Sequence, residues 1–383
     1  MRFYNFIYRT GLALCLGAFG WAHALWSAED AAEGVAPFSF VVFGDNQFAT
    51  ESPTSGVPER LAVPKVVVAL KPTLILHTGD LMDHGYDAGA YERFAEYYRE
   101  MLAAAPFFPT MGNHDAGKGI GNYGAFLEEQ VRRRNAAAYG AEAYAREFVV
   151  RLRDDPVEYP TRFNDPGVAA AKRLVPSGVS FKTYYSVRFR NACFISLEQG
   201  TRWWANTPLP WLERTLREAR EQGGTDHIVV FMHHPLYSTT MADNPPDPAA
   251  PGSGECMLPV RRLYEDLFRR YDVTLVFSGH AHLYDRFCVP DDGTPTRATP
   301  PPGRYEHDGR SIHYIVTGGG GGPLNPGGWR EESSWAFAQN RVCAYHVVEV
   351  LVQGRELTVR AQRVSGTAER PVNTLFEQFT IGP

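Results

Sequence analysis

The sequence predicts an α/β fold built on parallel strands. Short apolar runs alternate with amphipathic segments from Phe38 to Thr110 and again from Pro208 to Thr317. The run Phe38 to Phe43 is apolar apart from Ser39, which is typical of a strand buried on both faces of a parallel sheet. In open sheets of this kind, sites are built at the carboxyl ends of the strands. The residues that follow each apolar run are therefore the ones that can carry chemistry.

The other elements are expected from the same patterns of apolar spacing. Further strands are predicted at about 72–77, 106–110, 181–189, 192–197, 228–232, 273–277, 311–316, 345–352 and 356–362. Helices are predicted at about 58–70, 88–104, 208–221 and 259–269. The stretch from about 123 to 177 is rich in Ala and Arg, and we expect a helical cap inserted into a single domain of residues 37–363. Residues 364–383 are expected to form a tail that packs on this domain.

Length and charge exclude some functions. The chain has 383 residues, with a hydrophobic fraction of 44% that is normal for a protein with a buried core. Its formal net charge is −5 and it carries no basic stripe, so specific nucleic-acid binding is not expected.

Residues 1–24 are expected to form a signal peptide. Arg2 and Arg9 precede the apolar run Gly11–Trp21, which is too short to span a membrane comfortably. Ala22-His23-Ala24 supplies the small-residue pattern that precedes cleavage. The sequence therefore predicts an exported protein, periplasmic or secreted, with no membrane span in the mature chain. An uncleaved N-terminal anchor that tethers the protein to a membrane is the alternative.

Four cysteines remain after the expected cleavage: Cys193, Cys256, Cys288 and Cys343. An even number in an exported protein permits disulfides. Cys256 and Cys288 lie in Pro-rich, loop-like surroundings and are the expected pair, whereas Cys193 lies in an apolar run and is expected to be a buried thiol.

Metal-donor side chains follow separate predicted strands. They are Asp45, Asp80, Asn113 with His114, His233, and His280 with His282. Each also has a structural interpretation: the acidic residues as helix caps, Asn113 to Asp115 as a turn, and His233-His234 as buried, hydrogen-bonded histidines. Gly279-His280-Ala281-His282 is the most specific motif, because two histidines at i and i+2 can point imidazoles at neighbouring metals. Because metal-donor residues recur at the ends of separate predicted strands, the pattern favours a metal site.

In order and spacing these motifs resemble the calcineurin-like metallophosphoesterase superfamily. The motifs are Gly44-Asp45, Gly79-Asp80-Leu81-Met82-Asp83, Gly112-Asn113-His114-Asp115, Val230-Phe231-Met232-His233 and Gly279-His280-Ala281-His282. The segment Tyr314 to Thr317, with the glycine run that follows it, resembles the purple-acid-phosphatase-like branch. The resemblance implies a four-layer α/β/β/α sandwich of two mixed β-sheets.

The resemblance also implies a role for each residue around two divalent or trivalent metal ions, whether Fe, Mn or Zn. Asp80 would bridge the metals, and a water between them would be the nucleophile. The first metal would be held by Asp45 and His282, with Gln47 as a further candidate, and the second by Asn113, His233 and His280. Asn113 and His114 would face the substrate phosphate, and Asp115 would orient the His114 ring. His84 would line the substrate mouth, or be an ordinary surface histidine.

Two positions near the metals depart from the family pattern. The family commonly has His where this chain has Gln47, and a carboxamide is a neutral oxygen donor. A ligating Gln47 would favour Mn²⁺, Fe²⁺ or Mg²⁺ over Zn²⁺, and a Gln47 out of reach would leave the first metal short of a ligand. Asp83 stands where purple acid phosphatases have the Tyr that colours their ferric centre, so a colourless enzyme is expected.

The sequence thus predicts an exported, dinuclear-metal-dependent phosphoesterase that hydrolyses phosphate monoesters. A phosphodiesterase or nucleotide hydrolase with the same site is the close alternative. A non-catalytic protein that binds metal or phosphate is a further one, and Gln47 is its main support. The expected substrate is a small phosphate ester, a nucleotide or a phosphoprotein.

Overall fold

The computed structural model describes residues 35–48, 58–87, 89–116, 119–152, 184–197, 209–240, 258–290, 303–307, 311–324 and 338–383. All of them belong to one unit, Val35–Pro383. The expected signal peptide at 1–24 lies outside the described residues, as does Cys256 of the expected disulfide. Within the described ranges, no helix combines the length and the apolar character needed to cross a membrane.

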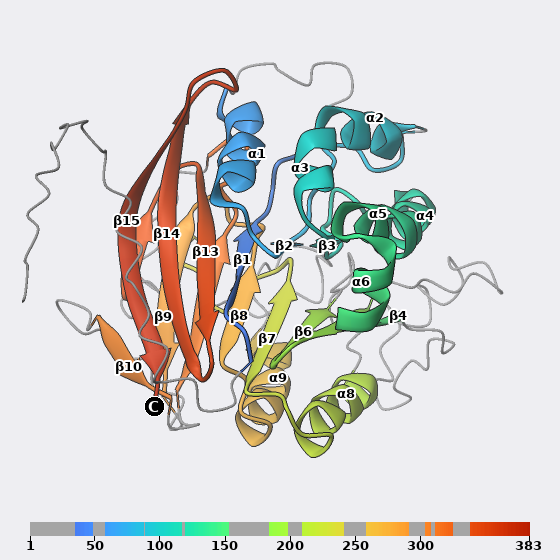
Figure 1. Cartoon of the computed structure of the whole chain (residues 1–383). Coiled ribbons are helices and arrows are strands. Elements are labelled where there is room, and N and C mark those ends of the chain that lie inside the picture. Colours follow the sequence, from blue (N-terminus) through green and yellow to red (C-terminus); the bar gives the residue numbers. More distant parts are fainter. Residues whose placement is uncertain are drawn as a thin grey trace, which may run out of the picture. The chain divides into compact units, whose positions relative to one another are not determined.

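Two mixed β-sheets form the centre of the unit (Figure 1). The described strands of the first sheet run in the order β10 (Arg304–Glu306), β15 (Pro371–Gly382), β14 (Glu356–Gly366), β13 (His346–Gln353), β1 (Phe38–Phe43), β2 (Leu74–His77) and β3 (Phe107–Pro109). Those of the second run in the order β12 (Asn340–Val342), β9 (Tyr284–Val289), β11 (Ile312–Thr317), β8 (Leu275–Ser278), β7 (His227–Met232), β6 (Ala192–Leu197), β5 (Tyr185–Phe189) and β4 (Phe148–Leu152).

Parallel pairing occurs where the predicted strand–helix alternation requires it. β1, β2 and β3 are mutually parallel in the first sheet, and β6, β7, β8 and β11 are parallel in the second. Their carboxyl ends therefore gather at one edge of each sheet.

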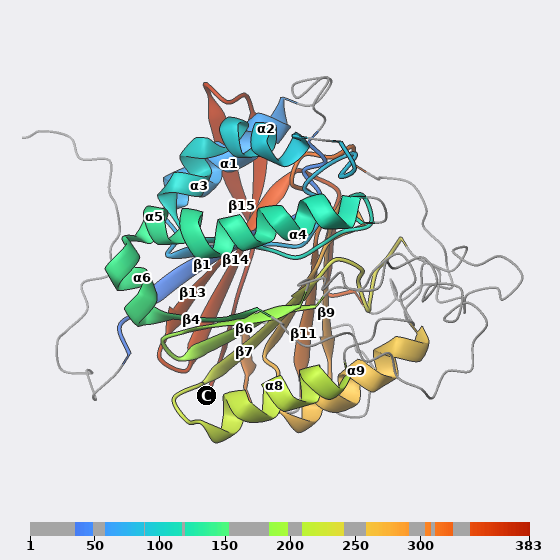
Figure 2. The same ribbon diagram turned by 90° about the vertical axis from the view of Figure 1, so that its right-hand side faces the viewer.

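Helices cover the outer face of each sheet, which gives the predicted four layers (Figure 2). One helical layer contains α1 (Glu59–Leu70), α2 (Ala90–Tyr97), α3 (Arg99–Ala104), α4 (Ile120–Glu129), the π-helix η2 (Gln130–Arg134), α5 (Asn135–Tyr139) and α6 (Ala141–Glu147). The other contains α8 (Leu209–Glu221) and α9 (Leu258–Arg270). Leu212 and Leu216 of α8 and Phe268 of α9 are buried against Ile228 and Val230 of β7.

The main core lies between the two sheets. Phe40 of β1 packs edge-on against Phe194 of β6, with ring centroids 5.1 Å apart, and also contacts Phe277 of β8. Burial of rings of this size supplies much of the driving force for sheet packing. The opening strand predicted from its apolar run is thus the centre of the sandwich.

Several strands were not anticipated. The segment 364–383, predicted as a tail, contains the end of β14 and all of β15, so it completes the first sheet instead of lying on it. The predicted helical stretch begins earlier, at Ile120, and ends at Glu147, where β4 begins. Its described part lies in the outer helical layer and the second sheet; residues 153–183 lie outside the described residues, so the cap stays a prediction. Cys193 is a buried free thiol, as expected.

Candidate metal centre

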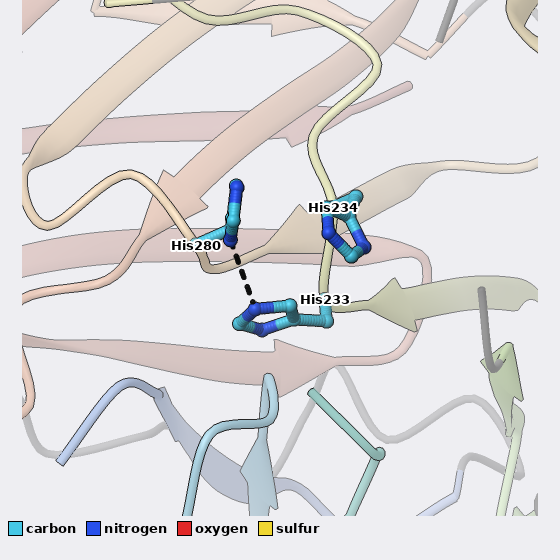
Figure 3. Close-up of side chains that lie close together, drawn as sticks. All are labelled: His233, His234 and His280. Carbon is cyan, nitrogen blue, oxygen red and sulfur yellow. Dashed lines mark hydrogen bonds between the residues drawn. The ribbon is translucent and has the colours of Figure 1, made fainter. Parts of the chain in front are cut away.

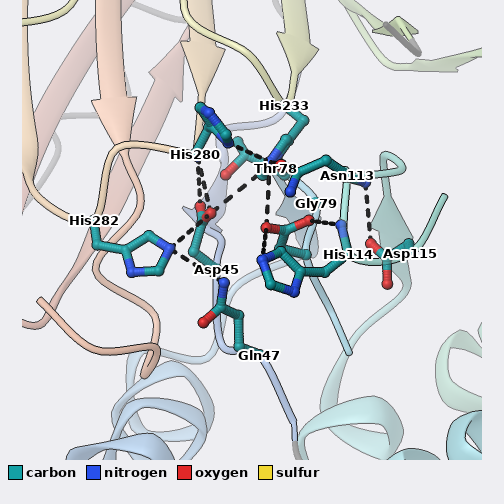
Figure 4. Close-up of polar contacts among 12 residues, drawn as sticks. Asp45, Gln47, Thr78, Gly79, Asn113, His114, Asp115, His233, His280 and His282 are labelled. Atoms are coloured by element: carbon teal, nitrogen blue, oxygen red, sulfur yellow. Dashed lines mark hydrogen bonds and ion pairs between the residues drawn. The ribbon is translucent and has the colours of Figure 1, made fainter. Parts of the chain in front are cut away.

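The predicted donors come together at the carboxyl ends of strands from both sheets (Figure 4). β1 leads to Asp45 and Gln47, β2 leads to Asp80, and β3 leads to Asn113 and His114. β7 leads to His233, and β8 leads to His280 and His282. Asp45, Asp80 and His233 are fully or almost fully buried, with exposed fractions of 0%, 1% and 0%. The site is therefore a buried cluster at the edge where the two sheets meet.

Several of these residues have a left-handed backbone conformation that non-glycine residues rarely adopt. The φ angles are 61° for Asp45, 43° for Gln47, 54° for Asp80 and 66° for His280. Main-chain hydrogen bonds hold them, since Asp45 N–H donates to Gly79 O at 2.9 Å and Gln47 N–H donates to Asp80 O at 3.0 Å. Such strain persists only where the surroundings impose it, and it gathers at functional sites.

His233 is the hub of one ligand set. Its Nδ1 donates to Thr78 O at 2.9 Å, which turns Nε2 toward the other donors. His233 Nε2 lies 3.4 Å from Asp80 Oδ2, 2.9 Å from Asn113 Oδ1 and 3.2 Å from His280 Nδ1. Figure 3 shows the His233 and His280 rings joined by this last contact. The residues predicted to hold the second metal thus converge beside the predicted bridging carboxylate.

The other ligand set surrounds Asp45. Asp45 Oδ1 lies 3.5 Å from His282 Nε2, and Gln47 Nε2 lies 3.4 Å from the same ring nitrogen. His282 Nδ1 donates to Pro323 O at 2.6 Å, so Nε2 faces the cluster. The amide of Gln47 therefore reaches the predicted first-metal ligands, whether or not it coordinates a cation.

The charges of the cluster are compatible with cation binding. Burial raises the pKa of Asp45. Burial acts in the same direction on Asp80, but the nearby His233 and His114 outweigh it and lower the pKa of Asp80. Burial disfavours a proton on His233, yet Asp80 and Asp45 raise the pKa of His233 to about 9. Two buried carboxylates thus need positive charge beside them, and oxygen and imidazole donors are ligands that Fe, Mn and Zn accept.

Glycine allows the loops to approach each other. A Cβ atom on Gly112 would lie 2.0 Å from Asp80 Oδ1, so any larger residue there would displace the predicted bridging ligand. The close approach also allows a main-chain hydrogen bond to the same carboxylate, in which His114 N–H donates to Asp80 Oδ1 at 2.9 Å. The Gly-Asn-His-Asp motif thus has a structural reason for its glycine.

The predicted contact between Asp115 and the His114 ring is wrong. The His114 ring contacts Asp83 instead: Nδ1 donates to Asp83 O at 2.8 Å and lies 3.5 Å from Asp83 Oδ1. The fully buried Asp115 carboxylate accepts from Tyr91 and from three main-chain N–H groups, those of Leu81, Met82 and Gly112. Burial raises the pKa of Asp115 to about 7, with Asp80 adding to the effect. Asp115 therefore braces the loops, and Asp83 positions the imidazole.

A family model described as calcineurin-like phosphoesterase matches residues 38–284. The chain belongs to this family. Relatives also support the purple-acid-phosphatase-like branch. Phosphoenolpyruvate phosphatase of Allium cepa is 34% identical over 33% of this chain and 23% of its own length. Probable inactive purple acid phosphatase 9 of Arabidopsis thaliana is 25% identical over 72% of this chain and 40% of its own. The match thus spans less than half of either relative.

A solved structure shows the same fold. Purple acid phosphatase PPD1 from yellow lupin (Lupinus luteus) seeds aligns with a TM-score of 0.57 at 16% identity. The alignment covers 91% of this chain and 54% of the lupin protein. Nearly all of this calcineurin-like phosphoesterase is therefore accounted for by a fold known from purple acid phosphatases.

The hydrogen bonds that hold the loops around the ligands of this phosphoesterase were not assigned from the sequence. The glycine run after β11 holds the end of β1, because Gly320 N–H donates to Gly44 O at 2.8 Å and Gly322 N–H donates to Asp45 O at 2.7 Å. Asn46 links two loops, accepting from His77 Nε2 at 2.7 Å and donating to Leu81 O at 3.1 Å. The glycine run can be recognised in the sequence, but a pattern of apolar residues does not predict which main-chain hydrogen bonds it makes.

Asp285 of β9 performs a similar role in the second sheet, where it holds the segment after β7. Its buried carboxylate accepts from Thr239 N–H at 2.8 Å and from Thr239 Oγ1 at 2.9 Å. It thereby fixes the segment that follows His233. Burial raises the pKa of Asp285 to about 6.

The two remaining histidines of interest differ in their surroundings. His234 is buried beside His280, with ring centroids 4.4 Å apart (Figure 3). It thus packs against a predicted metal ligand and restricts the orientation of that ring. The His84 side chain is 59% exposed and stacks on Tyr86, with centroids 5.3 Å apart and planes 17° apart. His84 also lies with Asp83 and His114 in a cluster whose ligand atoms are within 4.8 Å of one another.

Proposed function

We propose that this chain hydrolyses phosphate monoesters at a dinuclear metal centre formed by the buried cluster. One observation carries the proposal. The ligand atoms of Asp45, Asp80 and His233 lie within 4.8 Å of one another. These residues represent the first ligand set, the shared carboxylate and the second ligand set. Two cations about 3.5–4 Å apart need a shared anionic ligand at such a position.

The residues divide into the two sets described above. Asp45, His282 and the Gln47 amide would hold one cation, Asn113, His233 and His280 the other, and Asp80 both. When bound, the two cations would supply charge that stabilises the phosphoryl oxygens and lowers the pKa of a water. The backbone strain at Asp45, Gln47, Asp80 and His280 supports a preformed site, because it fixes donors from both sets before any ligand arrives.

His114 is proposed to act on the substrate. Its Nδ1–H is committed to Asp83 O, while Nε2 lies 3.9 Å from Asp80 Oδ2 and the side chain is about one-third exposed. Nε2 therefore faces the space between the shared carboxylate and the solvent, where a phosphate would approach. When both ring nitrogens carry protons, Nε2 can donate a hydrogen bond to a phosphoryl oxygen there, or its proton to the leaving group.

A phosphodiesterase or nucleotide hydrolase remains the alternative within the same site, because the ligand set binds a phosphoryl group without selecting its substituents. A non-catalytic role is the second candidate function. It is favoured by the relative named as probably inactive, which aligns with 72% of this chain, and by Gln47. The natural substrate is proposed to be a small phosphate ester, a nucleotide or a phosphoprotein.

Export of the protein is also proposed. Its support is the order of Arg2, Arg9, the apolar run Gly11–Trp21 and Ala22-His23-Ala24. Sequencing the N-terminus of protein recovered outside the cytoplasm tests it. A first residue of Leu25 is expected, and an intact Met1 on a membrane-bound protein would instead indicate an anchor.

A substrate screen tests the activity. Metal-free protein is reconstituted with Mn²⁺, Fe²⁺ or Zn²⁺ and assayed with p-nitrophenyl phosphate, a bis-p-nitrophenyl diester and nucleotides. The proposal expects turnover of the monoester that requires added metal. Turnover of the diester alone would indicate the alternative activity, and fully metallated protein that is inert to all three would support the binding function.

A further inference from the structure

We propose that Asp83, His84 and His114 form a further divalent-cation site, called here the outer site, and that a cation bound there inhibits the enzyme. The inhibition rests on the proposed function, whereas the binding does not. The outer site is separate from the buried cluster in its donors, since Asp83 and His84 belong to neither ligand set. Zn²⁺ is the cation whose chemistry fits best.

The distances among the three donors are close to those of one shared ion. His114 Nδ1 lies 3.5 Å from Asp83 Oδ1, and His84 Nε2 lies 4.0 Å from Asp83 Oδ2. Zinc binds nitrogen and oxygen at roughly 2.0–2.2 Å in a tetrahedron, which places two ligands about 3.4 Å apart. The first distance already matches. The exposed His84 side chain must move closer to both partners, because its ligand atom lies 4.0 Å from Asp83 Oδ2 and within 4.8 Å of the His114 ligand atom.

The backbone holds the two histidines near each other. Gly85 N–H donates to His114 O at 3.0 Å, so the loop after β2 is bonded to the loop after β3. A Cβ atom on Gly85 would lie 2.8 Å from Asp115 Cα, which shows how closely the loops pack. Stacking on Tyr86 further restricts the His84 ring. Little ordering is therefore needed when an ion binds.

The donor types favour zinc. Two imidazoles and one carboxylate are a ligand set that zinc uses in sites with an open fourth position. Exposure separates this site from the buried cluster: the Asp83 side chain is 39% exposed and that of His84 is 59% exposed, whereas Asp45 and Asp80 are buried. Hydration of the outer donors competes with the ion, so the outer site should fill only after the inner sites are loaded.

Occupation of the outer site removes His114 from its proposed task. The imidazole now donates its Nδ1–H to Asp83 O at 2.8 Å. Coordination at Nδ1 displaces that proton to solvent and breaks this hydrogen bond, and it ties the ring to an ion held between Asp83 and His84. The ring is then no longer free to adjust Nε2 to the phosphate and the leaving group. Excess zinc should therefore inhibit without removing the inner metals.

Metal counting tests the binding. Reconstituted protein is dialysed against increasing ZnCl2, and bound zinc is measured by mass spectrometry. We expect a weaker third equivalent beyond the two inner ions. His84→Ala should abolish it, and His84→Asp, which keeps an anionic donor, should restore it in part. His307→Ala is the matched control, because His307 also lies beside an aspartate, Asp272, at 3.4 Å, but near the opposite end of β8. That variant should keep the third equivalent.

Inhibition by zinc tests the consequence. Each variant is compared with its own rate before zinc addition, and His84→Ala should raise the midpoint of inhibition at least about tenfold. A protein that stops at two equivalents overturns the outer site, as does a third equivalent that His84→Ala binds equally well. Inhibition that is unchanged in His84→Ala overturns the regulatory part. If the metallated protein never turns over substrate, the proposed function fails, and the metal count still decides on the outer site.

Discussion

His114 Nδ1 donates to the main-chain oxygen of Asp83 at 2.8 Å, and the Asp83 carboxylate lies 3.5 Å from the same nitrogen. This pair joins the loop after β2 to the loop after β3 at the mouth of the buried cluster. The main-chain oxygen is the closer partner, so the ring keeps part of its orientation whatever side chain stands at position 83.

From this contact we expect a larger loss of kcat in His114→Ala than in Asp83→Ala. His114→Ala should lower kcat by ~10²–10⁴ with both metals retained, because it removes a group that acts on the phosphate. Asp83→Ala should lower kcat less, because the carbonyl still holds Nδ1. Steady-state kinetics with metal analysis of both variants checks this. An Asp83→Ala loss larger than that of His114→Ala would show that Asp83 acts on substrate or metal directly.

Asp115 should matter for stability more than for the chemical step. Asp115→Ala leaves three buried main-chain N–H groups without their acceptor, and the cost should be about 3–5 kcal/mol of unfolding free energy. Urea unfolding measures it. Glu96→Ala, on the exposed face of α2, is the control and should stay within about 0.5 kcal/mol. An Asp115 variant of normal stability with a normal fold would refute the bracing role.

The contrast between Asp83 and Asp115 shows where sequence reasoning stops. The donors at strand ends were predictable, because buried parallel strands read as apolar runs and their ends meet at one edge. The contacts of Asp115 with Leu81 and Met82 were not, because those partners are main-chain N–H groups of a loop distant in sequence. β15 was missed for a different reason: much of Pro371–Gly382 is exposed, so the segment lacks the apolar alternation of a half-buried strand.

Gln47→His should raise the affinity of the first metal position for Zn²⁺. The Gln47 amide lies 3.4 Å from His282 Nε2, so an imidazole there would join the Asp45 and His282 donors. Competition with a zinc-sensitive dye measures the affinity. Gln47→Asn, which keeps the amide but shortens the side chain, is the control and should not gain affinity. Unchanged zinc affinity in Gln47→His would mean that position 47 does not face the cation.

Asp285→Asn should change how stability depends on pH. The pKa of Asp285 is raised from 3.8 to about 6 by burial, partly offset by the hydrogen bonds from Thr239 and by Arg341. A raised pKa means that the folded state binds the proton more tightly. The stability that the folded protein gains from protonated Asp285 is complete below pH 3.8 and is lost as the pH rises through about 6.

The neutral amide in the variant lacks this titration. The stability of metal-free wild type relative to Asp285→Asn should therefore fall between about pH 4 and pH 6 and then level off. Urea unfolding of both proteins across this range measures the difference, in which the unchanged Asp115 titration cancels. Parallel stability curves would contradict the assignment.

The central claim is that Asp80 is the ligand shared by two metals, and metal content measures it most directly. Purified wild type and Asp80→Ala are reconstituted with the same cation, freed of excess metal and analysed for metal per chain. Circular dichroism confirms that the variant is folded. We expect two metals per wild-type chain, and little or no metal and no phosphoesterase turnover in Asp80→Ala. A folded Asp80→Ala protein that keeps both metals would contradict the account.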